Sequence, residues 1–344
     1  MAAESEAVEF WLSGVVSSFF PPPPPPGLYT ADDLLGQWNA GDPDSYAWTL
    51  DARVYRAALA QGLRCPARDE IAVARALHDV SITRALNRQL NGTRPVAIMG
   101  GHDMSRADPG YRMVAECARA LTEAGCTMIS GGGPGAMEAT HLGATFAHQP
   151  AHRLDAAIAV LTADPALTEF PLKPKDLVID GAFDPGALHR LHAWQAPAFQ
   201  IARAQRRTPT SIGVPTWLYG HEPPTPLAPL HAKYFENSIR EDGLLAVAEY
   251  GVLYAPGNAG TVQEVFQDAT QNYYRTVADH FSPMVFLDLG GCWTKTLPVS
   301  AILTVLFDAD DDKMVHYVTT VVDAVACISG HSARVSRGAH GRLV

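Results

Sequence analysis

The sequence has little cysteine, no excess of positive charge and no long apolar run, and each shortage excludes a class of protein. Its five cysteines among 344 residues are spaced neither as a zinc knuckle nor as a disulfide framework, so we expect a reducing, cytoplasmic setting. The formal net charge of −10 argues against a nucleic-acid partner, because a nucleic-acid surface needs a basic stripe. A small anionic ligand held by local dipoles is compatible with that charge.

The most apolar stretch near the N-terminus, residues 8–20, is too short to cross a bilayer. It follows Glu4 and Glu6 rather than a basic segment, so we expect neither a secretory signal nor a membrane partner. Residues 1–20 are predicted to form a short helix, and the six prolines at 21–26 predict a polyproline II spacer. A proline-reading module is an alternative partner for this spacer, but a rigid linker is the preferred interpretation.

The composition, 47% hydrophobic and 18% charged, is typical of a soluble globular protein. Residues 30–92 carry helical patterns without a cluster of chemically reactive side chains. We therefore interpret residues 1–92 as a helical N-terminal extension that includes the proline spacer. It is expected to serve as a cap or as a contact in a homo-oligomer, a dimer or higher.

From residue 93 onward, short apolar runs alternate with amphipathic helical patterns. Residues 95–101 and 126–130 are predicted strands, and residues 111–124 between them are a predicted helix. This alternation predicts an α/β fold, a doubly wound, Rossmann-like parallel sheet, with residues 93–344 as its nucleotide-binding domain.

An insertion at about residues 149–208 interrupts this alternation. It is rich in proline, alanine and histidine, and helices are predicted within it at 154–161 and 185–204. After it, one long helix is predicted over residues 230–249. A further strand and a closing helix are expected in the C-terminal part.

Two glycine-bearing loops follow predicted strands and precede predicted helices. The first is SGGGPGAME at residues 130–138, and the second is PGNAGTVQE at residues 256–264. Glycine is needed where the backbone approaches a ligand closely, and a helix N-terminus offers free N–H groups to an anion. Gly100 and Gly101 end a further predicted strand, residues 95–101, which comes first in the chain. Since ligands of such sheets bind at the carboxyl ends of the strands, we expect all three loops to face one crevice.

These two motifs resemble the paired motifs of the LOG family, cytokinin-activating phosphoribohydrolases formerly called lysine decarboxylase-like, whose usual forms are GGGxxGxMG and PGGxGTxxE. The stretch GPGAMEA, residues 133–139, is closer to the bacterial nucleotide 5′-monophosphate nucleosidases of the same superfamily. The resemblance covers roughly residues 94–290 without the insertion. It implies hydrolysis of the N-glycosidic bond of a nucleoside 5′-monophosphate to free base and ribose 5-phosphate, with no metal or other cofactor.

The predicted site has catalytic and binding parts. Glu264 is a carboxylate that can stabilise positive charge on the ribose or activate water. The resemblance also implies a catalytic arginine on the helix before the second motif, for which Arg240 is the candidate. The predicted substrate- and phosphate-binding residues are Gly101, His102, Asp103, Gly132, Gly133, Gly135, Met137, Glu138, Gly257, Asn258, Gly260 and Thr261.

Both catalytic candidates have structural alternatives. Glu264 can instead complete a capping box with Thr261, and the two roles are compatible. Arg240 lies one residue further from the motif than in the family pattern, a rotation of about 100° on a helix, which a kink at Gly243 would absorb. It can instead be a surface arginine paired with Glu236, in which case Lys233 would neutralise the phosphate.

The sequence also departs from the family motifs. Asn258 stands in place of the second glycine of PGG, although asparagine tolerates a left-handed backbone. Glu138 stands where the plant-type motif has glycine. The insertion contains His152, His189 and His192, whose spacing does not indicate a metal site.

Two functions from different classes stay open at this point. One is a nucleotide-hydrolysing enzyme, and the other is a non-catalytic nucleotide-binding sensor with the same fold. The orientation of the Arg240 guanidinium, into the crevice or into solvent, discriminates between them. A dinucleotide-dependent enzyme is a weaker third alternative, because no acidic residue follows the first loop at the required spacing.

Overall fold

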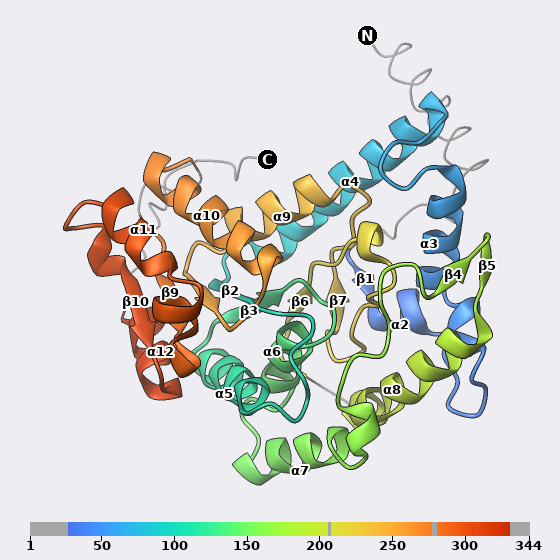
Figure 1. The fold of residues 1–344 in the computed structure, drawn as a ribbon, viewed down its shortest axis with the longest axis horizontal. Helices are drawn as coiled ribbons and strands as arrows, with labels where there is room; N and C mark the ends of the chain where they lie inside the picture. Colours follow the sequence, from blue (N-terminus) through green and yellow to red (C-terminus); the bar gives the residue numbers. More distant parts are fainter. Residues whose placement is uncertain (1–26, 206–207, 277–280, 331–344) are drawn as a thin grey trace.

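The fold is described from a computed structural model, which covers residues 27–205, 208–276 and 281–330. The helix expected over residues 1–20 and the spacer at 21–26 lie outside the described residues. The chain forms one eight-stranded sheet flanked by helices, with the β9–β10 end and the β1 end far apart in the view of Figure 1.

The sheet has the order β1-β7-β6-β3-β2-β8-β9-β10 and is parallel except for β1, which runs antiparallel to β7. This architecture confirms the predicted doubly wound α/β fold. A separate two-stranded sheet pairs β4 with β5. The strands are β1 Tyr29–Thr30, β2 Pro95–Met99, β3 Thr127–Ser130, β4 Val178–Ile179, β5 Ala182–Phe183, β6 Ile212–Gly213, β7 Leu230–His231, β8 Val252–Tyr254, β9 Met284–Leu287 and β10 Val315–Val318.

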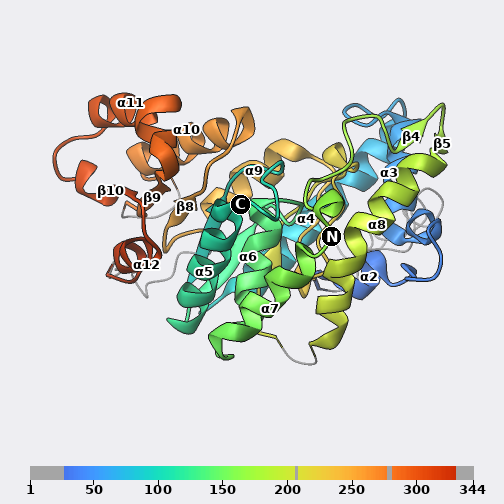
Figure 2. The same ribbon diagram turned by 60° about the horizontal axis from the view of Figure 1, so that its bottom comes forward.

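The central strands are apolar because helices cover both of their faces. In β2, Ala97 and Met99 point into one hydrophobic cluster, and Val96 and Ile98 point into the other. Helices α4, α9, α10 and α11 contribute to the first cluster, and α5, α6, α7 and α12 to the second. Helices α5 and α6 lie side by side in both views (Figures 1 and 2).

The helices are α2 Ala31–Leu35, α3 Leu50–Gln61, α4 Asp69–Leu90, α5 Pro109–Glu123, α6 Ala136–Thr145, α7 Ala151–Leu161, α8 Pro185–Ala204, α9 Asn237–Ala246, α10 Ala259–Tyr274, α11 Val299–Leu306 and α12 Val321–Ser329. Short 3-10 helices occur at Ser45–Trp48, Pro165–Leu167, Trp217–Tyr219, Leu289–Gly291 and Asp312–Met314, and a π-helical turn at Cys292–Thr296.

The prediction of one long helix over residues 230–249 is wrong. Leu230–His231 form strand β7, which is bonded between β6 and β1, and α9 begins only at Asn237. The side chain of Glu236 caps this later start by accepting from the Ser238 N–H at 3.4 Å. Pairing with neighbouring strands overrides the local helical pattern here.

The N-terminal region and the insertion pack on each other. Trp38, which follows α2, stacks on Phe199 of α8 with ring centroids 3.9 Å apart. The ring of His192, also from α8, stacks on Trp38 with centroids 4.7 Å apart, and its Nε2 bonds to the Asn39 carbonyl at 2.8 Å. The helices α7 and α8 confirm the two helices predicted within the insertion.

Candidate functional site

The three glycine loops meet at Gly101, which follows β2. Strand β2 lies between β3 and β8, so its loop separates the two longer ones. The Gly101 N–H donates to the Pro256 carbonyl at 3.1 Å, and the Gly101 carbonyl accepts from the Ala136 N–H at 3.1 Å. The expected adjacency of the loops is therefore made by backbone hydrogen bonds through this residue.

Close approach explains why glycine is required at two of these positions. Gly135 has φ of +67°, and a Cβ there would lie 2.3 Å from the Gly101 carbonyl oxygen. A Cβ on Gly257 would lie 2.2 Å from Thr261 Oγ1 and 2.9 Å from the Gly101 nitrogen. Any side chain at either residue would push the loops apart.

A row of buried, hydrogen-bonded side chains fixes the backbone of the first loop. Ser130 Oγ accepts from the Gly132 N–H at 3.1 Å and lies 2.9 Å from His141 Nε2. His141 Nδ1 lies 2.9 Å from Ser211 Oγ. Burial lowers the pKa of His141 to about 3, so its ring is neutral at physiological pH.

The second loop ends at an open helix N-terminus. Helix α10 begins at Ala259, and Gly260 faces open space. Within the described part of the chain, the N–H groups of Ala259, Gly260 and Thr261 donate to no protein acceptor. These donors and the helix dipole favour an anion at this point. Burial raises the pKa of the Cys292 thiol, and the Gly257 backbone lowers it, so Cys292 lies beside this loop.

Glu264 does not complete a capping box. The helix starts two residues before Thr261, so Glu264 lies in its second turn, and the N-cap Asn258 makes no side-chain capping bond. The interpretation of Glu264 as a capping residue is therefore wrong. Its carboxylate is held instead by a cation from α9.

That cation is Arg240, whose guanidinium lies beside Glu264 and not in solvent. Arg240 Nη1 is 3.7 Å from Glu264 Oε1 and 4.0 Å from Glu241 Oε1, and Nε donates to the Val214 carbonyl at 2.7 Å. The Arg240 side chain is 8% exposed, so the interpretation as a surface arginine paired with Glu236 is wrong. Helix α9 continues through Gly243 as one element.

The guanidinium connects both glycine loops. Its Nη2 lies so close to Gly131 that a Cβ on this glycine would sit 2.2 Å away. Met137 lies against the same glycine, with Sδ 2.5 Å from the position of such a Cβ. The space beside Gly131 is therefore filled by the Arg240 guanidinium and the Met137 thioether.

The environment of Glu264 changes its acidity. Burial raises the pKa of the Glu264 carboxyl to about 7, Arg240 lowers it, and the charge of Glu241 raises it further. The side chain is 13% exposed. A carboxyl that titrates near neutrality at a crevice rim is suited to proton transfer.

A second carboxyl, Glu222, was missed by the sequence analysis. Its Oε1 lies 3.9 Å from His102 Nδ1 and 3.6 Å from His221 Nε2, and its side chain is 16% exposed. Burial raises the pKa of Glu222, and the charges of His102 and Arg240 lower it. The available signal was its position, shortly after the apolar run SIGVPTW at residues 211–217.

The other predicted binding residues divide into two groups. Asp103 and Asn258 are exposed and bond to each other, with Asn258 Nδ2 2.7 Å from Asp103 Oδ2. Glu138 is buried, and its two oxygens accept from Arg106 at 2.7 and 2.8 Å and from the Tyr111 hydroxyl at 3.1 Å. Its carboxylate is therefore occupied by protein donors.

Lys233 is not available to a phosphate, so that alternative is wrong. Its side chain is fully buried and forms an ion pair with Asp51. Asp51 also accepts from the Trp217 indole at 2.9 Å and from the Tyr46 hydroxyl at 2.9 Å. This cluster joins α3 to the segment after β7.

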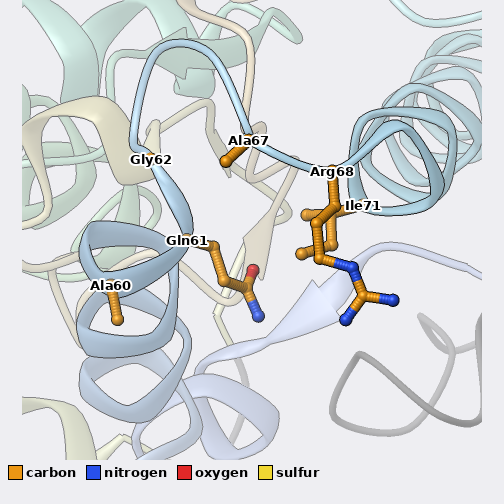
Figure 3. A pocket seen from close by; sticks show the side chains of 6 residues that line it. All are labelled: Ala60, Gln61, Gly62, Ala67, Arg68 and Ile71. Atoms are coloured by element: carbon orange, nitrogen blue, oxygen red, sulfur yellow. The ribbon is translucent and has the colours of Figure 1, made fainter.

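The surface is hollowed in two further places. A pocket of about 350 Å³ lies at the turn between α3 and α4, where Gln61 and Arg68 face each other across its opening (Figure 3). None of its lining residues comes from a glycine loop. A second pocket of about 400 Å³ includes Glu241 and Gln263, the direct sequence neighbours of Arg240 and Glu264.

No group of three or more potential metal ligands of the His, Cys, Asp or Glu type occurs in the residues that the structure describes. In the same residues no single helix is long and apolar enough to span a membrane. One bent pair, Leu289–Thr296 with Val299–Leu306, meets the length and composition criteria at an angle of 56°.

No protein-family model matches the chain, and no curated protein matches it in sequence. Among solved structures, the structural-genomics target TM1055 is 18% identical over 70% of this chain and 100% of its own, with a TM-score of 0.41. A molybdenum cofactor binding protein from Rippkaea orientalis is 12% identical over 69% of this chain and 96% of its own, with a TM-score of 0.40. The molybdenum cofactor carrier protein from Chlamydomonas reinhardtii is 14% identical over 69% and 97%, also at 0.40. None of these likenesses indicates an activity for this chain.

Proposed function

We propose that the chain is a LOG-like phosphoribohydrolase, which cleaves the N-glycosidic bond of nucleoside 5′-monophosphates. The observation that carries the proposal is the Arg240–Glu264 pair beside the open N-terminus of α10. An anion site, a cation and a carboxyl that titrates near pH 7 then lie within one crevice. These are the groups that hydrolysis of the N-glycosidic bond of a nucleoside 5′-monophosphate requires.

The phosphate binds the free N–H groups of Ala259, Gly260 and Thr261. These donors point out of the helix end and carry its positive partial charge. Asn258 and Gly260 are exposed, so an anion reaches them from solvent. Phosphate binding at this point places the ribose next to the second turn of the helix, which carries Glu264.

Glu264 and Arg240 act at the ribose. As the bond from C1′ to the base nitrogen breaks, its electron pair leaves with the base, and the ionised Glu264 stabilises the positive ring. Glu264 then takes a proton from the water that attacks C1′. Arg240 orients the Glu264 carboxylate and binds a ribose hydroxyl. Glu222, whose pKa is raised by burial, donates the proton that the leaving base needs.

The test is to incubate the full chain with AMP, GMP, CMP and UMP and to measure free base by chromatography. Base release from at least one nucleotide is expected, and Glu264→Ala should abolish it while nucleotide still binds in calorimetry. Glu116→Ala is the matched control, because Glu116 is a half-exposed acid on α5 that pairs with Arg112. Base release by Glu264→Ala at the wild-type rate would contradict the assigned role.

The second candidate is a nucleotide-binding protein without hydrolase activity. One observation favours it: Val214 and Glu264 hold Arg240 against Gly131, so the pair serves as a structural clamp on the first loop. The same experiment separates the two functions. Binding of a nucleotide without release of any base would establish the sensor and exclude the enzyme.

A further inference from the structure

The pocket of about 400 Å³ next to the Arg240–Glu264 pair has a wall built from four parts of the chain. Arg64 comes from the loop after α3, Tyr219 from the 3-10 helix at Trp217–Tyr219, Asn237 from the start of α9, and Gln263 from α10. Its volume is within the range of about 300–1,000 Å³ that small-molecule sites occupy.

This pocket adjoins the proposed catalytic groups. Glu241 lines the pocket, and its Oε1 lies 4.0 Å from Arg240 Nη1. Gln263 Nε2 donates to Glu241 Oε2 at 2.8 Å, which closes the wall between α9 and α10. Tyr219 lines the same pocket, and its pKa is raised by burial and by the charge of Glu241 and lowered by the charges of Arg240 and Arg64. A molecule with its sugar at Glu264 therefore has this pocket as the neighbouring space.

The polar groups of the pocket favour a ligand with neighbouring N–H donors. Asn237 is 9% exposed, and its Oδ1 has no hydrogen-bond partner among the described residues. Glu241, also 9% exposed, presents a second acceptor. A buried acceptor without a donor is costly, so a ligand that supplies a donor to Asn237 Oδ1 gains from filling it. Glu241 Oε2 already accepts from Gln263, which leaves Oε1, 4.0 Å from Arg240 Nη1, as the oxygen that faces a ligand donor.

The remaining groups suit an aromatic base. Tyr219 is 39% exposed and offers a ring on which a base can stack. Arg64 is a donor at the rim, and a guanidinium matches the O6 and N7 acceptors of guanine. Guanine alone among the common bases presents N1–H and an adjacent amino group, the pair of donors that a carboxylate accepts.

We propose that this pocket receives the base of the nucleotide and selects guanine, through Glu241 and Asn237 on its N–H donors and Arg64 on its acceptors. The proposal rests on the proposed function for the placement of the sugar. It assigns a role to Arg64, which comes from the N-terminal region, and to Asn237 and Glu241 of α9. All three lie outside both glycine motifs.

The experiment compares GMP with IMP, which differ only in the amino group at position 2. Hydrolysis is measured as kcat/KM, and affinity by calorimetry. Wild type is expected to favour GMP by about 10-fold or more in both, the discrimination of one good base contact. In Glu241→Gln and, separately, in Asn237→Leu, the GMP-to-IMP ratio should fall toward one.

Asp242→Asn is the matched control. Asp242 follows Glu241 on α9 and also joins α9 to α10, because its Oδ1 accepts from Gln267 Nε2 at 3.0 Å and from Gln271 Nε2 at 2.8 Å. Asp242 does not line the pocket. This variant should keep the GMP preference. A similar loss in the control would mean that the helix contact, rather than the pocket, sets the preference, and would overturn the proposal.

The two proposals fail in different ways. Equal kcat/KM and equal affinity for GMP and IMP in an active enzyme would overturn the guanine pocket alone. Absence of base release, together with tighter binding of GMP that depends on Glu241, would overturn the hydrolase and keep the pocket. Absence of binding to GMP and IMP, with base still released from another nucleotide, would overturn the pocket alone, and absence of binding to every nucleotide tested would overturn both.

Discussion

The pairs Arg106–Glu138 and Arg240–Glu264 both lie near the glycine loops, and they differ in contact distance and in exposure. In Arg106–Glu138 two charged contacts of 2.7 and 2.8 Å join side chains that are each 1% exposed. In Arg240–Glu264 a single contact of 3.7 Å joins side chains that are 8% and 13% exposed. The first pair is saturated by protein groups, and the second is not.

The surroundings explain the difference. Arg106 also donates to the Trp194 carbonyl at 2.8 Å and lies 4.0 Å above the Trp194 ring, so it ties the insertion to the sheet. Arg240 and Glu264 have open backbone donors and a pocket beside them. A saturated pair stabilises a fold, whereas a pair with unused bonding capacity at a rim can bind a ligand.

The largest expected effect is on catalysis at the unsaturated pair. Glu264→Ala should lower base release by about 10²–10⁴-fold, the range that a positioned acid or base contributes. Its free energy of unfolding should fall by less than about 1 kcal/mol, because a loose, partly exposed pair contributes little and because removal of the buried charge acts in the stabilising direction near pH 7. Initial rates with each nucleotide and urea unfolding check both parts. A stability loss as large as that expected for Glu138 would show that the pairs are alike.

The saturated pair should give the opposite result. Glu138→Ala leaves the Arg106 guanidinium buried without its counter-charge, which costs about 3–5 kcal/mol. Urea unfolding measures this loss, and Glu116→Ala, with its half-exposed carboxyl, is the control that should stay near wild type. A Glu138→Ala protein of undiminished stability would remove the structural role given to this pair.

The pH dependence of stability sharpens the comparison. The pKa of Glu264 in the folded protein is raised from 4.5 to about 7 by burial, so the folded state binds this proton more tightly than the unfolded state. The stability that the folded state gains from binding this proton is complete below about pH 4.5 and is lost as the pH rises to about 7. The free energy of unfolding therefore falls over this pH range.

Glu264→Gln should remove this dependence. The difference in unfolding free energy between the variant and wild type should grow by up to roughly 3 kcal/mol in favour of the variant from pH 4.5 to pH 7. Asp268, whose pKa burial also raises to about 7, is present in both proteins and cancels in the difference. A difference that is constant with pH would contradict the raised pKa.

The sequence was sufficient for the features that follow from local pattern. Apolar strands followed by glycine and amphipathic helices predicted the parallel sheet, and the rule that strand ends share one edge predicted the meeting of the loops at Gly101. Glu264 and Arg240 were found through motif resemblance, and the structure brings them together.

The sequence was insufficient where the structure of a segment depends on residues that are far away in the chain. Strand β7 has two residues and exists because β6 and β1 pair with it, which no local pattern records. Arg106 is 32 residues from Glu138, so the saturation of that carboxylate depends on the folded chain. Glu222 reaches the crevice through a loop with several prolines, whose path is set by packing rather than by periodicity.

The smallest expected effect concerns the exposed contact between Asp103 and Asn258, which joins the loop after β2 to the second glycine loop at 2.7 Å. A double-mutant cycle with Asp103→Ala and Asn258→Ala should give a coupling of about 0.2–1 kcal/mol, the usual value for exposed polar pairs. Backbone bonds through Gly101 already hold these loops together, so their spacing does not need this contact. A coupling above about 2 kcal/mol would mean that side chains, and not the backbone, set the distance between the loops.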